Sequence, residues 1–361
     1  MMKPYQKLLS GVIALLTSLL LTVPAFAAEP TFTDVPTTSP WYDGVEYLAA
    51  HSVTVGTGEG RYSPDAPITV RQWAVMLCRL YQKTEALESP GTEFGAACVK
   101  EAFQSGWLTA ESISAPDTRI CRSALYRSAF SAVDLPVYAA SLYPEGEALS
   151  SLDNYMRLGM EIGLCTETDS PLELVTRGEA ASVLFTLLSS DYQISEPPIL
   201  SHFPIQNEEG VCMNDYLLEL QRVPEPILQA FERYGWIYTI NFQFLADLSL
   251  KYDMTCIGAA DYSAKRIYVS EAHATVHEFG HFLDCVLGSP SKSYTFYAEE
   301  ASATSPFLRD YARTNCREYF ADYFVYWLEH YDKPDKAAMM QSLTPKTYQY
   351  FSALSQNNWG L

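Results

Sequence analysis

The chain has 361 residues, of which 48% are hydrophobic and 13% are aromatic, and its formal net charge is −19. A chain of this length and apolar content is expected to form two or more domains with real cores, so disorder is not expected. A strongly negative surface repels phosphate groups. We therefore predict that neither nucleic acid nor anionic membranes are partners.

The first 28 residues have the pattern of a secretory signal peptide. Lys3 and Lys7 precede an apolar run over residues 8–23, and the small residues that follow suit cleavage before Glu29. The alternative is a membrane anchor, but the run is shorter than the ~20 residues of a typical span. We therefore predict export, with no membrane contact after cleavage.

Residues 29–190 show one pattern three times: an apolar helix, a loop with glycine or proline, and a second helix that follows a threonine. We place the repeats at residues 29–85, 90–138 and 140–190. Threonine side chains cap helix N-termini, so Thr69, Thr118 and Thr176 are the predicted N-caps. A helix pair this short cannot bury its apolar face alone, so the three units are expected to pack together.

The clearest sequence signals of these units lie in the first repeat. They are the segment Phe32-Thr33-Asp34-Val35, Trp41 and the loop Tyr62-Ser63-Pro64. On these pieces and the recurring caps, the three units resemble S-layer homology repeats, with the second and third degenerate. The resemblance implies an all-α pseudo-trimer that binds a secondary cell-wall polymer, and hence a secreted protein attached to the bacterial cell wall or S-layer.

Arginine recurs beside the predicted caps, at Arg71, Arg119 and Arg177. A cation next to a helix N-terminus can hold an anionic sugar. We expect these side chains to contact the polymer, and the alternative is that they are solvated surface arginines.

Residues 191–204 contain Pro197-Pro198 and a further proline, and predict an extended linker. Residues 205–361 then form one domain-sized unit without a repeat. Helices are expected at 213–223, 224–234, 274–286 and 305–331, and strands at 236–242 and 266–270. This part of the chain is therefore predicted to be α+β.

Residues 277–281 have the sequence H-E-F-G-H in an apolar helical frame. Residues four apart lie on one helical face, so His277 and His281 can both reach one metal ion, and zinc accepts such nitrogen donors. Glu278 follows the first histidine and can take the proton of a metal-bound water. The alternative is a surface helix with two incidental histidines, which the buried character of Phe279 disfavours.

A catalytic zinc site needs a third protein ligand, and no histidine follows His281 closely enough to serve. The downstream carboxylates are Glu299, Glu300, Glu318 and Glu329. Glu318 lies in an amphipathic helical run, and Asp322, one turn on, is placed to hydrogen-bond a ligand histidine. We favour Glu318, and the pair Glu299 and Glu300 is the alternative.

The eight cysteines leave two questions open. An even number in an exported protein permits disulfides, but buried thiols are equally compatible and no pairing can be predicted. Cys285 and Cys316 lie near the metal motif, and we expect buried apolar thiols there rather than metal ligands.

The H-E-F-G-H segment, followed 37 residues after His281 by Glu318-Tyr319-Phe320-Ala321-Asp322, resembles the anthrax-lethal-factor-like peptidases. This family includes secreted Pro-Pro endopeptidases. The resemblance implies a gluzincin-type α+β fold and one catalytic Zn²⁺ held by His277, His281 and Glu318. It also implies a tyrosine seven residues before the third ligand that supports the oxyanion, and that position is Tyr311. Seven residues make two helical turns, so Tyr311 and Glu318 are expected to share a face, with simple packing as the alternative for Tyr311.

In gluzincin folds an edge strand before the metal helix pairs with the extended substrate. We assign this role to the strand that contains Ile267, Tyr268 and Val269, with residues 258–262 as the preceding loop. The alternative is an ordinary core strand. His273 is predicted to be a loop residue, although it could face the cleft.

Together these features predict a secreted, wall-attached zinc endopeptidase with a protein or peptide substrate, cleaved by zinc-activated water. The resemblance suggests Pro-Pro bonds of surface proteins as the target. The domain order is a signal peptide at 1–28, the repeats, a linker at 191–204 and a metallopeptidase domain at 205–361. The alternatives are a wall-binding adhesin with a vestigial peptidase fold and a zinc hydrolase of cell-wall peptides.

Overall fold

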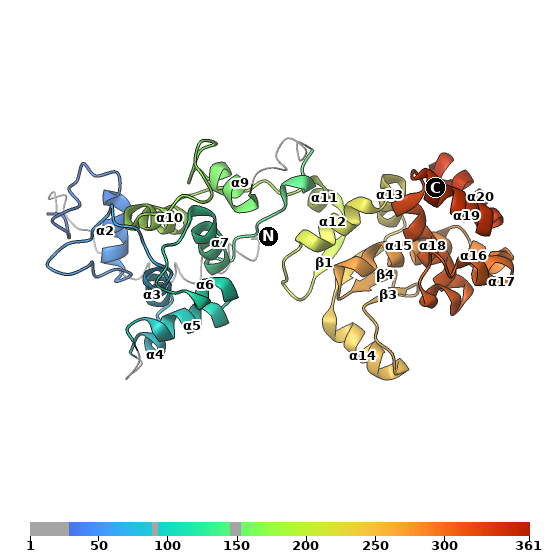
Figure 1. Ribbon diagram of the computed structural model, residues 1–361, viewed down its shortest axis with the longest axis horizontal. Coiled ribbons are helices and arrows are strands. Elements are labelled where there is room, and N and C mark those ends of the chain that lie inside the picture. The colour runs from blue at the N-terminus through green and yellow to red at the C-terminus, as the bar shows by residue number, and fades with distance from the viewer. Residues whose placement is uncertain (1–28, 89–92, 145–152) are drawn as a thin grey trace. The chain divides into compact units, whose positions relative to one another are not determined.

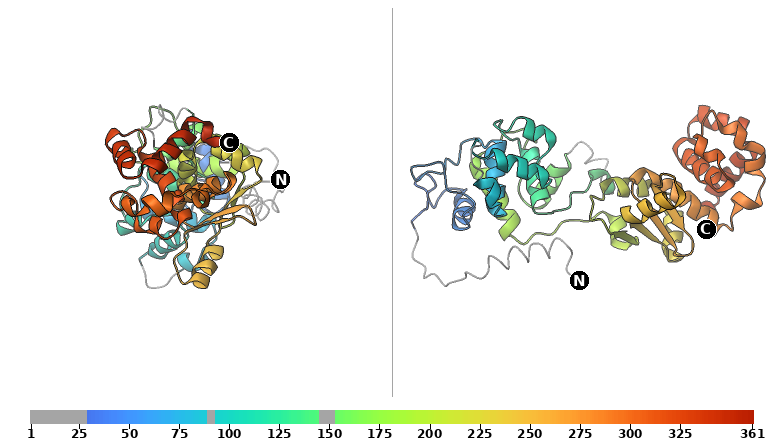
Figure 2. Two further views of the ribbon diagram at one scale, coloured as in Figure 1. Left: turned by 90° about the vertical axis from the view of Figure 1, so that its right-hand side faces the viewer. Right: turned by 90° about the horizontal axis from the view of Figure 1, so that it is seen from below.

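The computed structural model describes residues 29–88, 93–144 and 153–361, so the predicted signal peptide lies outside the described residues. The chain divides into two compact units. The described part of the first covers residues 29–88, 93–140 and 153–195, and that of the second covers 141–144 and Glu196–Leu361. Figures 1 and 2 show that the named strands belong to the second unit, so the protein is mixed α+β. Within the described residues, no helix has both the length and the apolar character that a bilayer crossing requires.

The first unit is built from helices. They are α2 (Tyr42–Ala50), α3 (Val70–Leu80), α4 (Thr84–Leu87), α5 (Ala96–Gln104), α6 (Ala110–Ser114), α7 (Arg122–Ala132), α9 (Asn154–Glu161) and α10 (Arg177–Ser189). The 3-10 turn η2 (Ala140–Leu142) spans the division between the two units. Each predicted repeat contacts another through one pair of helices: α3 packs on α5, α7 packs on α9, and α10 packs on α2. The helices thus bury their apolar faces against the neighbouring repeat, as short helix pairs must.

A closed ring of backbone hydrogen bonds joins the three predicted repeats. Ile68 N–H donates to Val175 O at 3.0 Å, Val175 N–H donates to Ile120 O at 3.1 Å, and Ile120 N–H donates to Ile68 O at 3.1 Å. Each repeat therefore supplies one donor and one acceptor at the same position, directly before its second long helix. These three residues are structurally equivalent.

The ring corrects the predicted N-cap of the second repeat. The residues that follow the ring are Thr69, Cys121 and Thr176, and each precedes the first residue of a helix. Thr118 was predicted for this place, but its hydroxyl instead donates to Ala115 O at 2.7 Å in the preceding turn. The prediction was wrong by three residues because Cys121 gives no capping signal.

The second unit begins with a short helix where an extended linker was predicted. Its elements are α11 (Pro198–His202), β1 (Ile205–Asn207), α12 (Asn214–Arg222), α13 (Glu225–Arg233), β2 (Ile237–Ile240), α14 (Phe242–Tyr252), β3 (Gly258–Asp261), β4 (Arg266–Val269), η3 (Ala272–Ala274) and α15 (Thr275–Val286), followed by α16 (Pro290–Ser293), α17 (Phe296–Glu300), η4 (Ala301–Thr304), η5 (Asp310–Arg313), α18 (Cys316–His330), α19 (Pro334–Leu343), α20 (Pro345–Gln356) and η6 (Asn358–Gly360). Proline at the first helical position suits a helix N-terminus, which is the reason that Pro198 begins α11.

The sheet has the strand order β1-β2-β4-β3, with β3 antiparallel to β4 and the other pairs parallel. The strand that contains Ile267, Tyr268 and Val269 therefore has neighbours on both sides, and its assignment as the edge strand was wrong. The edge beside it is β3, which was predicted to be a loop. Glycine and alanine are poor strand formers, so β3 carries almost no strand signal of its own.

Helices cover both faces of the sheet. Phe244 of α14 stacks on Tyr268 at 3.8 Å between ring centroids, and Phe279 of α15 stacks on Tyr238 at 6.4 Å. Tyr238 pairs with Ile267, whose side chain points to the opposite face from that of Tyr268, so the two helices lie on opposite faces. Helix α15 is consequently buried between the sheet and the helices that follow it in the chain.

Candidate metal centre

Helices α15 and α18 form the scaffold of the site. They touch at Gly280, where an ideal Cβ would lie only 2.7 Å from Ala321 Cα. A side chain at this position would hold the helices apart, so glycine permits their close approach. His277 and His281 come from α15 and Glu318 comes from the first turn of α18, and all three face the same space.

The donor atoms of His277, His281 and Glu318 all lie within 4.8 Å of one another. Both imidazoles converge on one oxygen: Nε2 of His277 is 3.0 Å and Nε2 of His281 is 3.2 Å from Glu318 Oε2. Two nitrogens and one carboxylate oxygen that converge in this way fit a tetrahedral zinc ion with one position left over. The structure thus brings together the three residues that were predicted to bind the metal.

Proton affinities within the cluster reflect the same convergence. Burial lowers the pKa of His277, but hydrogen bonds with Asp322 and Glu318 outweigh it and raise that pKa to about 9. Burial raises the pKa of Glu318, but hydrogen bonds with His277 and His281 bring it well below its usual range. A positive charge is therefore strongly favoured at the point where the three donors meet, whether a proton or a metal ion supplies it.

Glu278 lies between this cluster and the edge strand. It is buried, and its Oε2 has no hydrogen-bond partner within the described residues. Burial raises the pKa of this carboxyl, opposed by His281 and His277. On the other side, an ideal Cβ at Gly258 of β3 would lie 2.5 Å from Glu278 Oε1, so only glycine leaves room there. An unpartnered buried carboxylate beside a metal cluster is suited to proton transfer.

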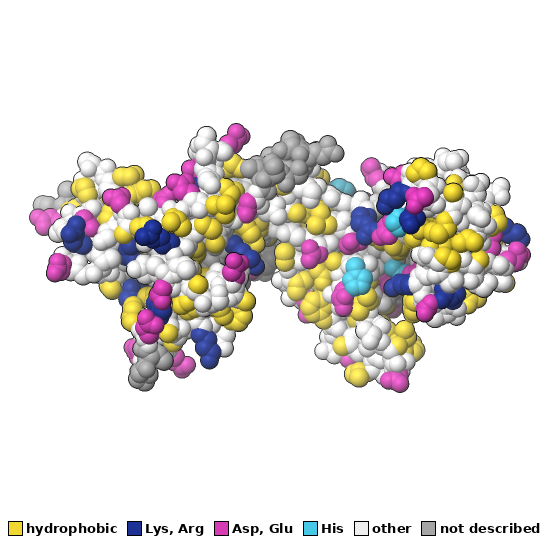
Figure 3. Space-filling model, viewed as in Figure 1, with side chains coloured by type: hydrophobic (Ala, Val, Ile, Leu, Met, Phe, Trp, Pro, Cys, Tyr) yellow, Lys and Arg dark blue, Asp and Glu magenta, His cyan; other side chains and the backbone are white. Residues whose placement is uncertain are grey.

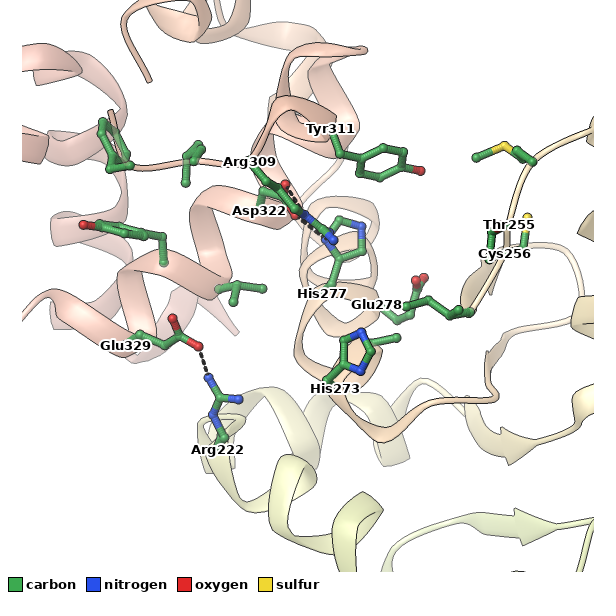
Figure 4. A pocket seen from close by; sticks show the side chains of 18 residues that line it. Arg222, Thr255, Cys256, His273, His277, Glu278, Arg309, Tyr311, Asp322 and Glu329 are labelled. Carbon is green, nitrogen blue, oxygen red and sulfur yellow. Dashed lines mark hydrogen bonds and ion pairs between the residues drawn. The ribbon is translucent and has the colours of Figure 1, made fainter. Parts of the chain in front are cut away.

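Asp322 lies one turn after Glu318 and contacts the first histidine. Its Oδ1 is 2.7 Å from His277 Nδ1, and its two oxygens accept a fork from Arg309, with Nε–Oδ2 at 2.7 Å and Nη2–Oδ1 at 2.6 Å (Figure 4). Burial raises the pKa of Asp322, but the hydrogen bonds from His277 and Arg309 outweigh it and lower that pKa. Arg309 was not predicted as a site residue, because nothing in its local sequence indicates that its side chain contacts α18.

Tyr311 reaches the site by a different route from the one predicted. It lies in η5, and α18 begins only at Cys316, because the Asn315 side chain caps that helix by accepting from Arg317 N–H and Glu318 N–H. The two residues therefore do not share a helical face, and that argument was wrong. The Tyr311 ring nevertheless lies 6.1 Å from the His277 ring, and burial together with Glu318 and Glu278 raises the pKa of its hydroxyl to about 12.

A cavity of about 580 Å³ opens beside these groups. Its lining includes His277, Glu278, Arg309, Tyr311 and Asp322, residues 254–258 before and within β3, and apolar side chains of the segment before η5 and of α18. Histidine side chains lie among basic and acidic ones on this unit's surface in Figure 3. Of the three predicted ligands, His277 lines this cavity, with Glu278 beside it, so the cavity reaches one side of the cluster.

Two further polar groups of the lining were not predicted as site residues. Arg222 of α12 forms an ion pair with Glu329 of α18, and His273 of η3 faces the pocket (Figure 4). Glu329 is thereby held by an arginine and is not part of the metal cluster. His273, which was predicted to be a loop residue, lies in a 3-10 turn directly before α15.

The alternative ligands do not reach the cluster. Glu300 is buried and accepts hydrogen bonds from Lys346 N–H and Thr347 N–H, at the start of α20, and Glu299 pairs with the Lys346 side chain. The eight cysteines are all free thiols, and none belongs to the metal cluster among the described residues.

The arginines of the first unit are mostly occupied by partners within the protein. Arg71 forms a fork with Asp117, and Arg119 is exposed. In the register of the hydrogen-bond ring, Arg122 rather than Arg119 is the counterpart of Arg177, since each lies two residues after its ring residue, and the Arg122 guanidinium is buried against acidic side chains. Arg177 stacks on the Tyr62 ring at 4.7 Å and has no ion-pair partner among the described residues.

Two family models match the chain. S-layer homology domain matches residues 31–69, and Anthrax toxin lethal factor, N- and C-terminal domain, matches residues 249–354. No curated protein matches. Both matches confirm the composite predicted from the sequence, and the second contains all of the predicted metal-binding residues. The chain thus carries an S-layer homology domain at its N-terminus and an anthrax lethal factor-like domain in its C-terminal half.

Proposed function

We propose that this protein is a zinc-dependent endopeptidase held at the bacterial cell wall. The S-layer homology domain indicates attachment to the wall or S-layer, and the lethal factor-like domain indicates peptidase activity. The observation that carries the proposal is the convergence of His277, His281 and Glu318 within 4.8 Å of one another, beside the unpartnered carboxylate of Glu278.

His277, His281 and Glu318 would hold the zinc ion, which when bound supplies a Lewis acid and lowers the pKa of its water. Glu278 takes a proton from the attacking water and later gives it to the leaving amine. The Tyr311 hydroxyl, whose raised pKa keeps it protonated, donates a hydrogen bond to the oxyanion of the tetrahedral intermediate. Asp322 accepts from His277 Nδ1–H and so directs Nε2 of that ring toward Glu318.

The substrate backbone would pair with β3. This strand is one of the two edges of the sheet, its Gly258 abuts Glu278, and the cavity follows the residues that precede it. An extended peptide that adds to a free edge gains backbone hydrogen bonds and passes the metal cluster at a fixed register. A bond between two prolines in a surface protein is the target suggested by the resemblance, and the gluzincin-type arrangement is part of the same proposal.

The first unit would serve as the anchor. Three repeats, closed by the ring of hydrogen bonds and by the contact of α10 with α2, would form the pseudo-trimer that binds a secondary cell-wall polymer. Arg119 would be the arginine available to an anionic sugar, because it is exposed, whereas Arg71 pairs with Asp117 and Arg177 is buried with its Nε donating to Tyr62 O. The predicted export through a signal peptide completes this proposal.

The decisive experiment compares the wild type with Glu278→Ala and His281→Ala against a peptide library and purified wall fragments. Glu278→Ala should retain zinc in elemental analysis yet lose nearly all turnover, whereas His281→Ala should lose the metal itself. Tyr311→Phe should lower turnover more than zinc content. A fully active Glu278→Ala variant would refute the mechanism. Cleavage of wall fragments alone would favour the cell-wall hydrolase, and no cleavage by a zinc-loaded wild type would favour a wall-binding adhesin.

A further inference from the structure

The Arg309 guanidinium contacts two parts of the proposed catalytic site: Asp322, beside the metal ligand His277, and the ring of Tyr311. Arg309 precedes η5 by one residue, and Tyr311 lies within that turn, so the two side chains come from the same short segment. The Arg309 side chain reaches α18 and still lines the cavity, with 55% of its surface exposed. Its exposure is unusual for a side chain whose hydrogen bonds all lead to a buried carboxylate.

On the first side, Arg309 fixes the carboxylate that orients His277. Both Asp322 oxygens accept from the guanidinium, at 2.6 and 2.7 Å, and Asp322 Oδ1 is also 2.7 Å from His277 Nδ1. Arg309 Nη2 and His277 Nδ1 both donate to Asp322 Oδ1, so their 3.1 Å separation is a contact between two donors that share one acceptor. A two-point fork leaves a carboxylate little rotational freedom, whereas a single hydrogen bond would let it turn.

On the second side, Arg309 lies against the ring of Tyr311. Its Cζ is 5.1 Å from the ring centroid, which is the geometry of a cation–π contact. The Tyr311 hydroxyl has no hydrogen bond within the described residues, and more than a third of this residue is exposed. The guanidinium is thus the main polar contact that holds the ring beside His277.

We propose that Arg309 is a positioning residue that couples the orientation of His277, through Asp322, to the position of the Tyr311 phenol. The inference rests on the proposed peptidase function. It assigns to a single side chain the alignment of a metal ligand and of the oxyanion donor, which stand on separate elements, α15 and η5. Lysine could not replace Arg309 in its contact with Asp322, because an ammonium cannot form the two-point fork.

The test compares Arg309→Met with Arg313→Met. Methionine keeps the apolar stem in both cases. Arg313 pairs with Asp310 in the same turn, and within the described residues its side chain forms no ion pair with Asp322. In Arg309→Met we expect the dissociation constant for zinc to rise about 10- to 100-fold, the range for loss of a partner outside the ligand set. We also expect kcat to fall with little change in KM, because the lost alignment matters in the transition state. Arg313→Met should match the wild type in zinc affinity and kcat.

A double-mutant cycle separates coupling from simple structural damage. If Arg309 positions the phenol, Tyr311→Phe should lower kcat less in the Arg309→Met background than in the wild type. Guanidinium ion at millimolar concentration should partly restore zinc affinity in Arg309→Ala and leave Arg313→Ala unchanged. An unaltered zinc affinity in Arg309→Met overturns the link to His277, and fully multiplicative effects on kcat overturn the link to Tyr311. If the zinc-loaded wild type cleaves no peptide, the proposed function fails, but the zinc measurements still decide whether Arg309 orients His277.

Discussion

Replacement of Gly280 by alanine tests whether the spacing of α15 and α18 sets the activity. The new Cβ would lie 2.7 Å from Ala321 Cα and 3.1 Å from Ala321 Cβ. Carbon atoms in contact prefer separations of about 3.5–4.0 Å, so the two helices would have to part by roughly 1 Å at this point. His277 and His281 lie on one helix and Glu318 on the other, so the same movement pulls the metal donors apart.

The effects on stability and on activity should differ in size. Overpacking costs about 1–3 kcal/mol, while alanine in place of glycine in a helix returns roughly 1 kcal/mol. The free energy of unfolding of the second unit should therefore fall by no more than about 2 kcal/mol. A displacement of 1 Å in a catalytic constellation can cost about 100-fold in rate, so kcat/KM and zinc affinity should fall much more steeply.

Urea denaturation of the zinc-free protein gives the stability, and competition with a chelating dye gives the zinc affinity. Gly44→Ala is the matched control, because the new Cβ would lie 3.1 Å from Ala181 C at a contact between α2 and α10 in the first unit. It should lower stability in the same range and leave zinc affinity unchanged. Wild-type zinc affinity and kcat/KM in Gly280→Ala would refute the idea that this close approach aligns the donors.

Three further predictions concern the two units separately. Asp34 accepts from Tyr62 N–H and Ser63 N–H, which outweigh burial and lower its pKa. The stability that this carboxylate contributes is therefore present above the unfolded pKa of about 3.9 and lost as pH falls through the lower folded pKa. Asp34→Asn should destabilise the first unit by about 1 kcal/mol at pH 7, and the difference in thermal unfolding should vanish in strong acid. Glu300→Ala leaves two backbone donors at the start of α20, Lys346 N–H and Thr347 N–H, without an acceptor and removes the 2.6 Å hydrogen bond from the Thr347 hydroxyl. It should cost about 3 kcal/mol in urea denaturation of the second unit. Removal of metal by a chelator should abolish peptide hydrolysis and lower the unfolding temperature of the second unit, and added Zn²⁺ should restore both; hydrolysis that persists without metal would contradict the proposed chemistry.

Much of the fold was predictable where the signal was local. The helices α12, α13 and α15 and the strands β2 and β4 lie within a residue or two of the predicted ranges, because their apolar patterns are strong. Elements with weak propensity were missed. β3 consists of glycine, alanine and aspartate, and the cap of the second repeat is a cysteine, so neither carries a signal that a single sequence can reveal.

The sequence by itself determined the arrangement within one helix. A spacing of four residues places His277 and His281 on the same face with Glu278 beside them, since helical geometry fixes such neighbours wherever the helix lies. Tertiary structure decided everything that joins separate elements: the approach of Glu318 to the histidines past Gly280, the contact of Arg309 with Asp322, the position of Tyr311 outside α18, and the place of β3 at the edge beside β4. These contacts depend on which surfaces pack together and in which register, and packing is a property of the whole folded unit rather than of any segment.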